Sequence, residues 1–370
     1  MKTSREKADD EVVRSIQKWL KMRQDPLLMP TALSSMEDAN EDRRLVIIVN
    51  PTSGGKTGLK VLHDIVLPVL NAGGIHKITV VETLSRFSVP QQVADLNLDE
   101  IDDIIVIGGD GTLCGVVLGL SKHQAEKALS VPVGLIPCGS HNHMFKVMSG
   151  FKNVHGRVRQ RDVLLSLYRV CRHETTNLTI PLVQADGRDE SPFMCGLSFA
   201  LLAAAFKTSE KLRWTGLRKT RYYASILYHI FRMRKYSYDV RYLPATSEEV
   251  PPSMAPDTFS EEWVAETGPY QWLGFSPLSF GVPREEALND GWGYLMTIEN
   301  ARSPFGIIKT VLNPSLKMWE TEKNARLVNV KALSIRPLGD DREWNMDGEK
   351  MDNFDQVYVR FAPQPAKYLG

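Results

Sequence analysis

An apolar strand that ends in a glycine turn around one carboxylate is the feature that most limits the folds open to this chain. The run 104–107 (Ile-Ile-Val-Ile) passes at once into Gly108, Gly109, Asp110, Gly111 and Thr112. Glycine carries no Cβ, so its backbone can take left-handed turns and can leave room for the oxygens of a ligand. The pattern predicts a buried strand with a phosphate-binding turn at its carboxyl end, where Asp110 stands beside the ligand.

Two further turns follow apolar strands in the same region. The stretch 45–49 runs into Asn50, Pro51, Thr52, Ser53, Gly54, Gly55 and Lys56. The stretch 132–136 runs into a turn that contains Gly139, Ser140, His141 and Asn142. A single glycine-rich turn is usually only a change of chain direction, but open α/β sheets bind ligands where the carboxyl ends of their strands meet. We therefore expect these turns to lie together and to surround one polyphosphate.

The order of apolar patterns predicts two kinds of domain. Strand-like stretches at 45–49, 78–81, 104–107 and 132–136 alternate with helical patterns near 57–71, 89–97 and 113–121, which is typical of a Rossmann-like parallel sheet. Short strand-like stretches follow at 178–183, 237–243, 293–298, 332–337 and 356–361, which favours an antiparallel sandwich. We expect an N-terminal helix and linker over 1–43, an α/β nucleotide-binding domain over 44–150 and a β-rich domain over 151–370. The segment 244–269, with five prolines, five glutamates and one aspartate, is predicted to be a mobile acidic loop.

Composition narrows the class of protein. The chain has 370 residues, of which 43% are hydrophobic, and this is enough for more than one core. A net charge of +1 argues against a nucleic-acid partner, and four scattered cysteines argue for free thiols in a reducing compartment. The N-terminus lacks the apolar core of a signal peptide, and no apolar run reaches the roughly 18 residues of a spanning helix. We expect a cytoplasmic protein whose contact with intracellular or plasma membranes is peripheral, and whose helix at 11–22 docks on the body rather than in a membrane.

The turns also limit the chemistry. Together they could hold a triphosphate, and Asp110 could take a proton from an attacking hydroxyl or position a metal ion. Residue types alone do not decide between these two roles.

At this point the chain resembles a known family. The turn at 108–112, with Asn50-Pro51 and Gly54-Gly55-Lys56 upstream, resembles the catalytic domain of diacylglycerol kinase-type lipid kinases, whose fold is like that of the NAD kinases. The sphingosine and ceramide kinases are similar in further segments, at 209–216 with Arg221-Tyr222, at 240–244 and at 344–349. The resemblance extends over roughly residues 44 to 362, and it leaves sphingosine, ceramide and diacylglycerol open as substrates.

The resemblance implies an ATP- and Mg²⁺-dependent lipid kinase that phosphorylates the primary hydroxyl of a sphingoid lipid, with Asp110 as the base. It implies that the nucleotide is bound by Asn50, Pro51, Thr52, Ser53, Gly54, Gly55, Lys56, Thr83, Gly108, Gly109, Gly111, Thr112, Gly139, Ser140, Asn142, Arg213, Arg221, Asp347, Gly348 and Glu349. Asp347 would also bind the metal ion. The apolar helical segments 197–206 and 222–231 would line the lipid pocket through Leu197, Phe199, Leu202, Phe206 and Tyr222, although ordinary core packing explains each of these residues equally well.

Several positions depart from the family pattern. Gly115 stands where a glutamate usually follows the catalytic aspartate by five residues, and Phe206 stands where sphingosine kinases carry an acidic contact to the lipid head. His141 is bulky for the third turn, and with His143 it lacks a third ligand for zinc. These changes keep one alternative open, a kinase-fold protein that binds lipid or nucleotide with impaired turnover. A third alternative is a soluble-metabolite kinase of the NAD kinase type, which shares the Gly-Gly-Asp-Gly turn, although the apolar stretch 197–206 and the match over 209–222 argue against it.

Overall fold

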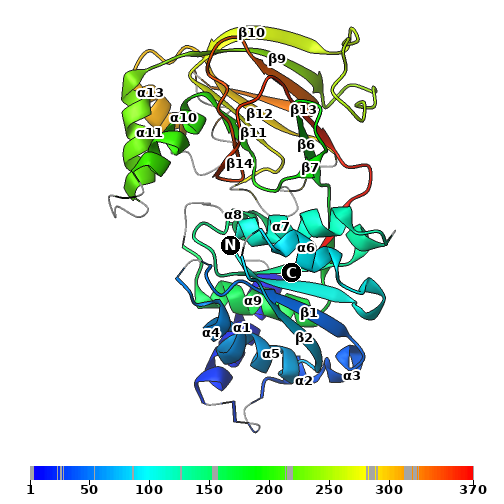
Figure 1. Cartoon of the computed structure of the whole chain (residues 1–370). Coiled ribbons are helices and arrows are strands. Elements are labelled where there is room, and N and C mark those ends of the chain that lie inside the picture. Colours follow the sequence, from blue (N-terminus) through cyan, green and yellow to red (C-terminus); the bar gives the residue numbers. More distant parts are fainter. Residues whose placement is uncertain are drawn as a thin grey trace. The chain divides into compact units, whose positions relative to one another are not determined.

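The computed structural model describes most of the chain and divides it into two compact units (Figure 1). Described are residues 4–369 except 23, 26, 28, 54, 86, 126, 152–156, 213, 215–219, 281, 283–287, 289–290, 312–318, 320–322 and 324. Unit 1 comprises Met1–Phe145, Arg157–Leu178 and Gln364–Gly370, and unit 2 comprises Lys146–Gly156 and Thr179–Pro363. The division expected from the sequence, 44–150 and 151–370, differs from these units because the chain returns twice to unit 1.

Unit 1 is built on a six-stranded sheet in the order β2-β1-β3-β4-β17-β5. The strands β1 (Arg44–Val49), β2 (Lys77–Glu82), β3 (Asp103–Gly108) and β4 (Val133–Pro137) are parallel. The strand β17 (Ala366–Leu369) runs parallel to β4 and antiparallel to β5 (Thr175–Leu178). The predicted α/β fold with a parallel sheet is confirmed, and β3 and β4 are buried along their whole length, as strands covered on both faces should be.

Helices cover both faces of this sheet. They are α1 (Ser4–Lys21), α2 (Thr31–Ser34), α3 (Glu37–Asn40), α4 (Gly58–Val61), α5 (Leu67–Ala72), α6 (Val89–Ala94), α7 (Asp110–Lys122), the start of α8 (His143–Met148) and α9 (Gln160–Cys171). A π-helical turn, Leu62–Val66, joins α4 to α5, and 3-10 turns lie at Leu98–Glu100 and Ala128–Ser130. α1 buries Val13, Ile16 and Trp19 in the core that α9 also lines. Among the described residues, no helix combines the length and the apolar character needed to cross a bilayer.

A buried ion pair fixes the end of the sheet where β3 begins. The Asp103 carboxylate is fully buried and accepts hydrogen bonds from Arg43 at 2.6 Å and 3.1 Å and lies 3.0 Å from His173 Nε2. The Arg43 guanidinium also donates to the Asn40 side chain at 2.7 Å. Because both charges are paired and hydrogen-bonded, their burial is tolerated, and the network ties α3, β3 and the end of α9 together.

Unit 2 is an antiparallel β-rich body, as predicted. Its strands are β6 (Pro181–Ala185), β7 (Ser191–Pro192), β8 (Leu197–Phe199), β9 (Tyr236–Pro244), β10 (Val264–Tyr270), β11 (Trp272–Ser276), β12 (Gly293–Ile298), β13 (Ala325–Pro337), β14 (Asn345–Met346), β15 (Glu349–Lys350) and β16 (Val357–Phe361). They form one curled 11-stranded sheet (Figure 1). The helices α10 (Ala200–Lys211), α11 (Thr220–Arg232) and α13 (Pro304–Val311) lie beside it. The strand expected over 178–183 is in fact two strands, β5 and β6, in different sheets.

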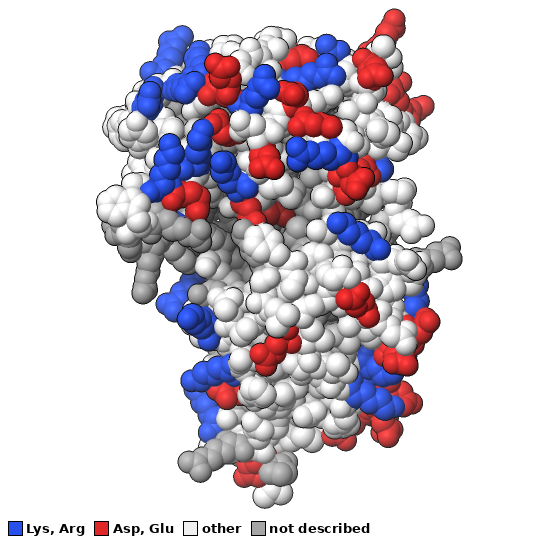
Figure 2. All heavy atoms as spheres, viewed as in Figure 1, with Lys and Arg blue, Asp and Glu red and all other residues white. Residues whose placement is uncertain are grey.

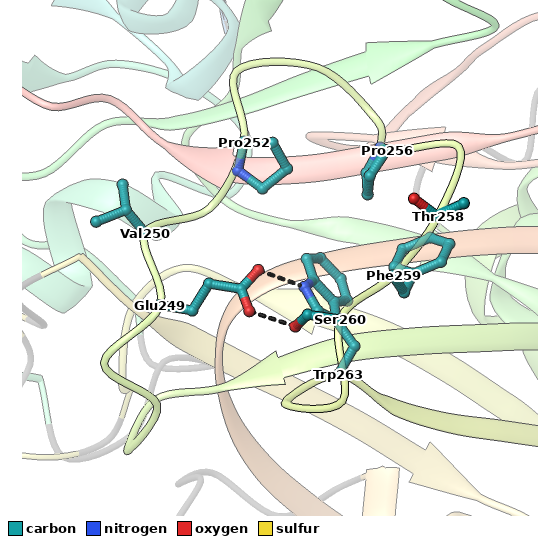
Figure 3. Close-up of a pocket in the computed structure, with 8 residues that line it drawn as sticks. All are labelled: Glu249, Val250, Pro252, Pro256, Thr258, Phe259, Ser260 and Trp263. Carbon is teal, nitrogen blue, oxygen red and sulfur yellow. Dashed lines mark hydrogen bonds between the residues drawn. The ribbon is translucent and has the colours of Figure 1, made fainter.

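The acidic segment is shorter and better packed than expected. β9 continues to Pro244 and β10 begins at Val264, so only 245–263 is a loop. Phe259 and Trp263 pack on Tyr358 of β16, and the Glu249 carboxylate accepts hydrogen bonds from Trp263 Nε1 at 3.0 Å and from the Ser260 hydroxyl (Figure 3). A cavity of about 400 Å³ is lined by Glu249, Val250, Pro252, Pro256, Thr258, Phe259, Ser260 and Trp263. The loop is therefore folded onto the sheet.

Candidate functional site

Three turns meet where the parallel strands of unit 1 end. β1, β3 and β4 lead into the turns at 50–56, 108–112 and 139–142 respectively, and β2 leads into Thr83. The Asn50 amide nitrogen donates to Thr112 Oγ1 at 3.2 Å, which joins the first turn to the second. The Cys138 N–H donates to the Gly108 carbonyl at 2.7 Å, which joins the third to the second. The structure thus brings these predicted residues to one sheet edge, except Gly54, which lies outside the described residues.

Gly109 and Gly139 form the closest contact between two of the turns. A Cβ atom added to Gly139 would lie 2.4 Å from Gly109 Cα, and one added to Gly109 would lie 2.9 Å from Gly139 Cα. No side chain fits at either position, so glycine is required by the approach of the two backbones. By contrast, a Cβ on Gly111 would meet no atom within 4 Å, so this residue borders open space.

Asp110 is half-buried and forms the first residue of α7. Its Oδ2 accepts a hydrogen bond from the His143 N–H and its Oδ1 accepts one from the Met144 N–H, both at 2.9 Å. The carboxylate therefore binds the start of α8, and two charge-assisted bonds fix its orientation. These amides were not among the predicted site residues, because they lie 33 and 34 positions from Asp110 in the sequence.

The rest of the first and third turns is held by local hydrogen bonds. The Asn50 Oδ1 accepts from the Thr52 N–H at 3.0 Å, and the Asn142 side chain both accepts from the Gly139 N–H at 2.8 Å and donates to its carbonyl at 3.0 Å. Lys56 and Asn142 have positive φ values of 60° and 51°, which suits tight turns. Burial raises the pKa of the neighbouring Cys138 thiol to about 11, so this thiol is protonated at neutral pH.

Thr83 carries an unpartnered polar atom at the same edge. Its side chain is 5% exposed, and its hydroxyl oxygen is buried without a hydrogen-bond partner among the described residues. Its N–H donates to the Val49 carbonyl at 2.9 Å, so the backbone is held by β1. A buried hydroxyl without a partner costs free energy, which a polar ligand at this edge would recover.

The remaining predicted nucleotide contacts belong to unit 2, where Arg221 has local partners. Its guanidinium donates to Glu210 at 3.1 Å and to the Tyr222 hydroxyl at 2.8 Å, and it lies 4.7 Å from the centre of the Tyr222 ring. Its Nε is buried and has no partner within the described part of the chain, so one donor stays available. Arg213 lies outside the described residues.

Asp347 is engaged by backbone amides. Its carboxylate accepts hydrogen bonds from the N–H groups of Met194, Cys195 and Gly196 at 2.8, 2.7 and 3.0 Å. Asp347 and Gly348 have φ values of 52° and 85°, which make the tight turn between β14 and Glu349 in β15. Asp347 therefore holds this hairpin against the segment before β8. Nowhere in the described ranges do three or more His, Cys, Asp or Glu side chains form a group that could bind a metal ion.

The expected lipid wall is only partly a helical surface. Leu197 and Phe199 lie in the strand β8 and are 2% and 0% exposed, and Phe199 stacks on Trp344 with ring centres 6.2 Å apart. The helix begins only at Ala200, whose φ of 52° marks a sharp turn out of the strand. The prediction of Leu197 and Phe199 on a helix is therefore wrong, because burial in a strand core produces the same apolar run.

Leu202, Phe206 and Tyr222 do lie on the helices α10 and α11. Phe206 and Tyr222 contact each other edge to face, with ring centres 5.8 Å apart. All three side chains are half-buried, so they are the predicted lipid contacts that keep accessible surface.

Comparison with known proteins agrees with this geometry. Residues 44–178 match the family described as the diacylglycerol kinase catalytic domain. The match begins at β1, ends at β5 and contains all three turns. The resemblance to lipid kinases of this type is confirmed, and the segment that carries Asp110 is similar to a diacylglycerol kinase catalytic domain.

The relatives that are similar in sequence include sphingosine kinases and a ceramide kinase. Sphingosine kinase 2 of Arabidopsis thaliana is 27% identical over 215 residues, which is 58% of this chain and 43% of the relative. Sphingosine kinase 2 of Homo sapiens is 29% identical over 57% of this chain and 32% of its own length, and human ceramide kinase is 23% identical over 55% and 38%. The chain thus matches less than half the length of each of these relatives. A putative diacylglycerol kinase from Bacillus anthracis str. Sterne shares the fold, with a TM-score of 0.62, 15% identity and coverage of 89% of this chain and 95% of that chain.

Proposed function

We propose that this protein is an ATP-dependent lipid kinase that transfers a phosphoryl group to the primary hydroxyl of a sphingoid lipid, either sphingosine or ceramide. The observation that carries the proposal is the meeting of three turns and the start of α8 around Asp110. Phosphoryl transfer depends mainly on the positioning and charge compensation of phosphate oxygens, and such an arrangement can supply both.

Asp110 would accept the proton of the lipid hydroxyl. Its two bonds to the amides of α8 hold the carboxylate in one orientation, which a general base needs in order to meet an incoming alcohol. The role as base is the one that the resemblance to lipid kinases implies for this residue.

The nucleotide would lie along the open side of the turns. The N-terminus of α7, a helix of 13 residues, presents the positive end of its dipole at Asp110 and Gly111. Gly111 borders open space, so a ligand could lie against its backbone. The Thr83 hydroxyl has no partner among the described residues, so it could form a hydrogen bond with the ligand. Within unit 2, Arg221 Nε is a buried donor without a partner in the described chain, and a phosphate oxygen is a suitable acceptor for such a group.

The residues present do not form a dedicated magnesium site. Asp347 gives its carboxylate to three backbone amides, and no metal-binding group of side chains occurs in the described ranges. We derive no step through a protein-held metal ion. A magnesium ion that arrives with ATP takes most of its ligands from phosphates and water, as this ion commonly does.

The lipid head would meet no acidic side chain at position 206 of unit 2. Phe206 replaces an acidic contact, and its neighbour Tyr222 is also uncharged. An ammonium-bearing sphingoid base would lose a counterion here, whereas the neutral amide of ceramide would lose less. We therefore propose ceramide ahead of sphingosine.

A membrane surface is the proposed partner, and α11 supplies the contact. Tyr223, Leu227 and Phe231 recur every four residues on this helix and are 65%, 44% and 58% exposed. Phe231 meets Phe305 of α13, which is 71% exposed. Exposed apolar surface of this extent marks an interaction site, and aromatic rings favour the boundary between lipid and water.

Basic side chains surround this apolar stripe. Arg232, Arg234, Lys235, Arg302 and Lys309 are exposed at the ends of α11 and α13. Figure 2 shows Lys and Arg gathered over the part of unit 2 where these helices lie. Anionic lipid head groups attract such residues, so the protein would bind a membrane peripherally.

Gly115 favours one second candidate, a kinase-fold protein with impaired turnover. A Cβ at this buried position of α7 would lie 3.0 Å from Val89 of α6, so any side chain here, including the family's glutamate, would require Val89 to shift. Loss of a carboxylate near the phosphates lowers the rate in many enzymes, which would leave binding without efficient transfer.

One assay separates the candidates. Purified wild-type protein, Asp110→Asn and the exposed control Glu100→Gln are given labelled ATP with ceramide, sphingosine or diacylglycerol in mixed micelles, or with NAD in detergent-free buffer. We expect ceramide to be labelled, with a loss of at least about 100-fold in Asp110→Asn alone. Equal background labelling in all three proteins would reject the kinase proposal. An ATP-dependent thermal shift without product would then favour the impaired protein, and labelled NAD would favour a soluble-metabolite kinase.

A further inference from the structure

The strand β2 leaves one edge of the unit 1 sheet open. It has six residues, and β1 is its one strand partner in the described chain. Val80 is 41% exposed, and Lys77, Thr79 and Glu82 are also exposed. The Ile78 N–H donates to the His76 carbonyl at 3.1 Å, and the Glu82 carbonyl accepts a bond from Gln92 Nε2 at 3.1 Å. The other backbone groups on this edge can pair with a strand that approaches, and a carbonyl oxygen can accept a second bond.

β2 lacks the protection that the other described edge strands have. β7 and β15 have two residues each, β5 has four, and β10 contains Gly268 and Pro269. β2 contains neither glycine nor proline, and its pairing with β1 shows no register shift. Its charges stand only at its ends, while 78–81 is a run of β-branched residues, Ile-Thr-Val-Val, of the kind that pairs well in sheets.

The sequence of β2 suits pairing with itself. Two copies related by a twofold axis perpendicular to the sheet run antiparallel, and one residue then stands opposite its own copy. With Thr79 at this centre, Ile78 stands opposite Val80, and His76 stands opposite Glu82. With Val80 at the centre, Ile78 would stand opposite Glu82, which is a poorer cross-strand pair.

We propose that a second copy of this chain docks on β2 as an antiparallel strand, with Thr79 opposite Thr79, and extends the sheet across a dimer. Lys77 stands opposite Val81 in this register, so no like charges face each other. Each copy has one such edge, so the pairing closes at two chains. The contact is smaller than the roughly 1,200–2,000 Å² of stable interfaces, and we expect a micromolar dissociation constant.

Sedimentation equilibrium of the full chain at about 1–200 μM tests this proposal, since that range brackets the affinities expected of small interfaces. We expect the dimer fraction to rise with concentration, and Val80→Lys to weaken dimerisation at least about tenfold by placing two cations in the pairing. Val250→Lys is the matched control, because Val250 is 84% exposed in unit 2. A monomer at all concentrations, or a Val80→Lys protein that dimerises like the wild type, overturns the proposal.

A cross-link tests the register. In Thr79→Cys the two new thiols would face each other and, with oxidised glutathione as the oxidant, would lose two protons and two electrons to form one disulfide. We expect this variant to form a covalent dimer, and the wild type and Ser85→Cys to remain monomeric on a denaturing gel. Cross-linking of Val80→Cys but not of Thr79→Cys overturns the proposed register.

Discussion

The contact between Gly109 and Gly139 makes a single methyl group a test of the site. In Gly139→Ala the new Cβ would lie 2.4 Å from Gly109 Cα, so the third turn must shift away from Asp110. We expect a loss of about 1–3 kcal/mol in the free energy of unfolding, as is usual for overpacking. We also expect the ATP-dependent thermal shift to disappear.

Gly111→Ala is the matched control for this change. Its Cβ would meet nothing within 4 Å, and it lies in the first turn of α7. Alanine is the better helix former, so we expect a gain of up to about 1 kcal/mol. Denaturant unfolding of both variants measures the difference, and equal stability of the two would contradict the contact.

At the residue scale, the sequence predicted those features that depend only on neighbouring residues. A strand followed by glycines identified the turns, because both signals lie within a few residues. The amides of His143 and Met144, 33 and 34 positions from Asp110, could not be identified as its partners from the sequence. The bonds of Asp347 to residues about 150 positions away were also beyond sequence patterns, so its expected role as a metal ligand remains a prediction.

At the element scale, α11 carries the predicted membrane contact. In the double variant Leu227→Ser/Phe231→Ser, two exposed apolar side chains become polar while the buried face with Arg221, Ser225 and Ile230 is kept. We expect the fraction bound to anionic vesicles to fall at least about tenfold, because each lost apolar side chain removes about 1.5–3 kcal/mol of possible burial.

Co-sedimentation with vesicles of phosphatidylserine and phosphatidylcholine measures this effect. Val250→Ser with Met254→Ser, at residues that are 84% and 58% exposed on the 245–263 loop, is the matched control and should bind like the wild type. Unchanged vesicle binding of the α11 variant would show that α11 does not contact the membrane.

The pairing of α10 with α11 should depend on pH through His229. Burial, and then Arg232 and Arg234, lower the pKa of this imidazole, and its Nε2 lies 2.8 Å from the Thr208 hydroxyl. The unfolded chain takes up a proton near pH 6.5, whereas the folded chain takes it up only at lower pH. The free energy of unfolding should therefore fall as pH drops below about 6.5.

His229→Gln keeps a side-chain donor for Thr208 but does not titrate. We expect its melting temperature to fall less than that of the wild type between pH 7.5 and pH 5, as measured by thermal denaturation in matched ionic strength. Parallel curves for the two proteins would show that His229 does not contribute.

Helices and strands could be predicted where the apolar residues follow one clear helical or strand pattern. The strands of unit 1 and the helix at 89–97 follow from their apolar patterns. The run 197–206 was misread because a buried strand and a buried helix both give continuous apolar residues, and only the positive φ of Ala200 separates them. The acidic segment 244–269 was read as one loop, since proline and glutamate hide the strand β10, which pairs along β9.

At the scale of the whole molecule, the sequence order of the elements does not give the units. β17 lies between β4 and β5 in the unit 1 sheet, although more than 180 residues of unit 2 separate it from β5. The four residues of β17 carry no pattern that assigns them to a parallel sheet. A boundary placed near residue 150 therefore cuts α9, β5 and β17 from the unit that they complete.

Removal of residues 364–370 should consequently destabilise the rest of unit 1, although that part of the chain ends at residue 178. Tyr368 and Leu369 are 3% and 0% exposed, and loss of such side chains costs about 2–5 kcal/mol each, in addition to the broken pairing with β4 and β5. The summed loss is a large part of the free energy of unfolding of an ordinary domain. Removal of Gly370 alone is the control and should leave unfolding unchanged. Limited proteolysis followed by mass spectrometry should show the first cuts in the longer truncation within 44–178, while unit 2 stays protected, and cuts confined to unit 2 would refute the placement of β17.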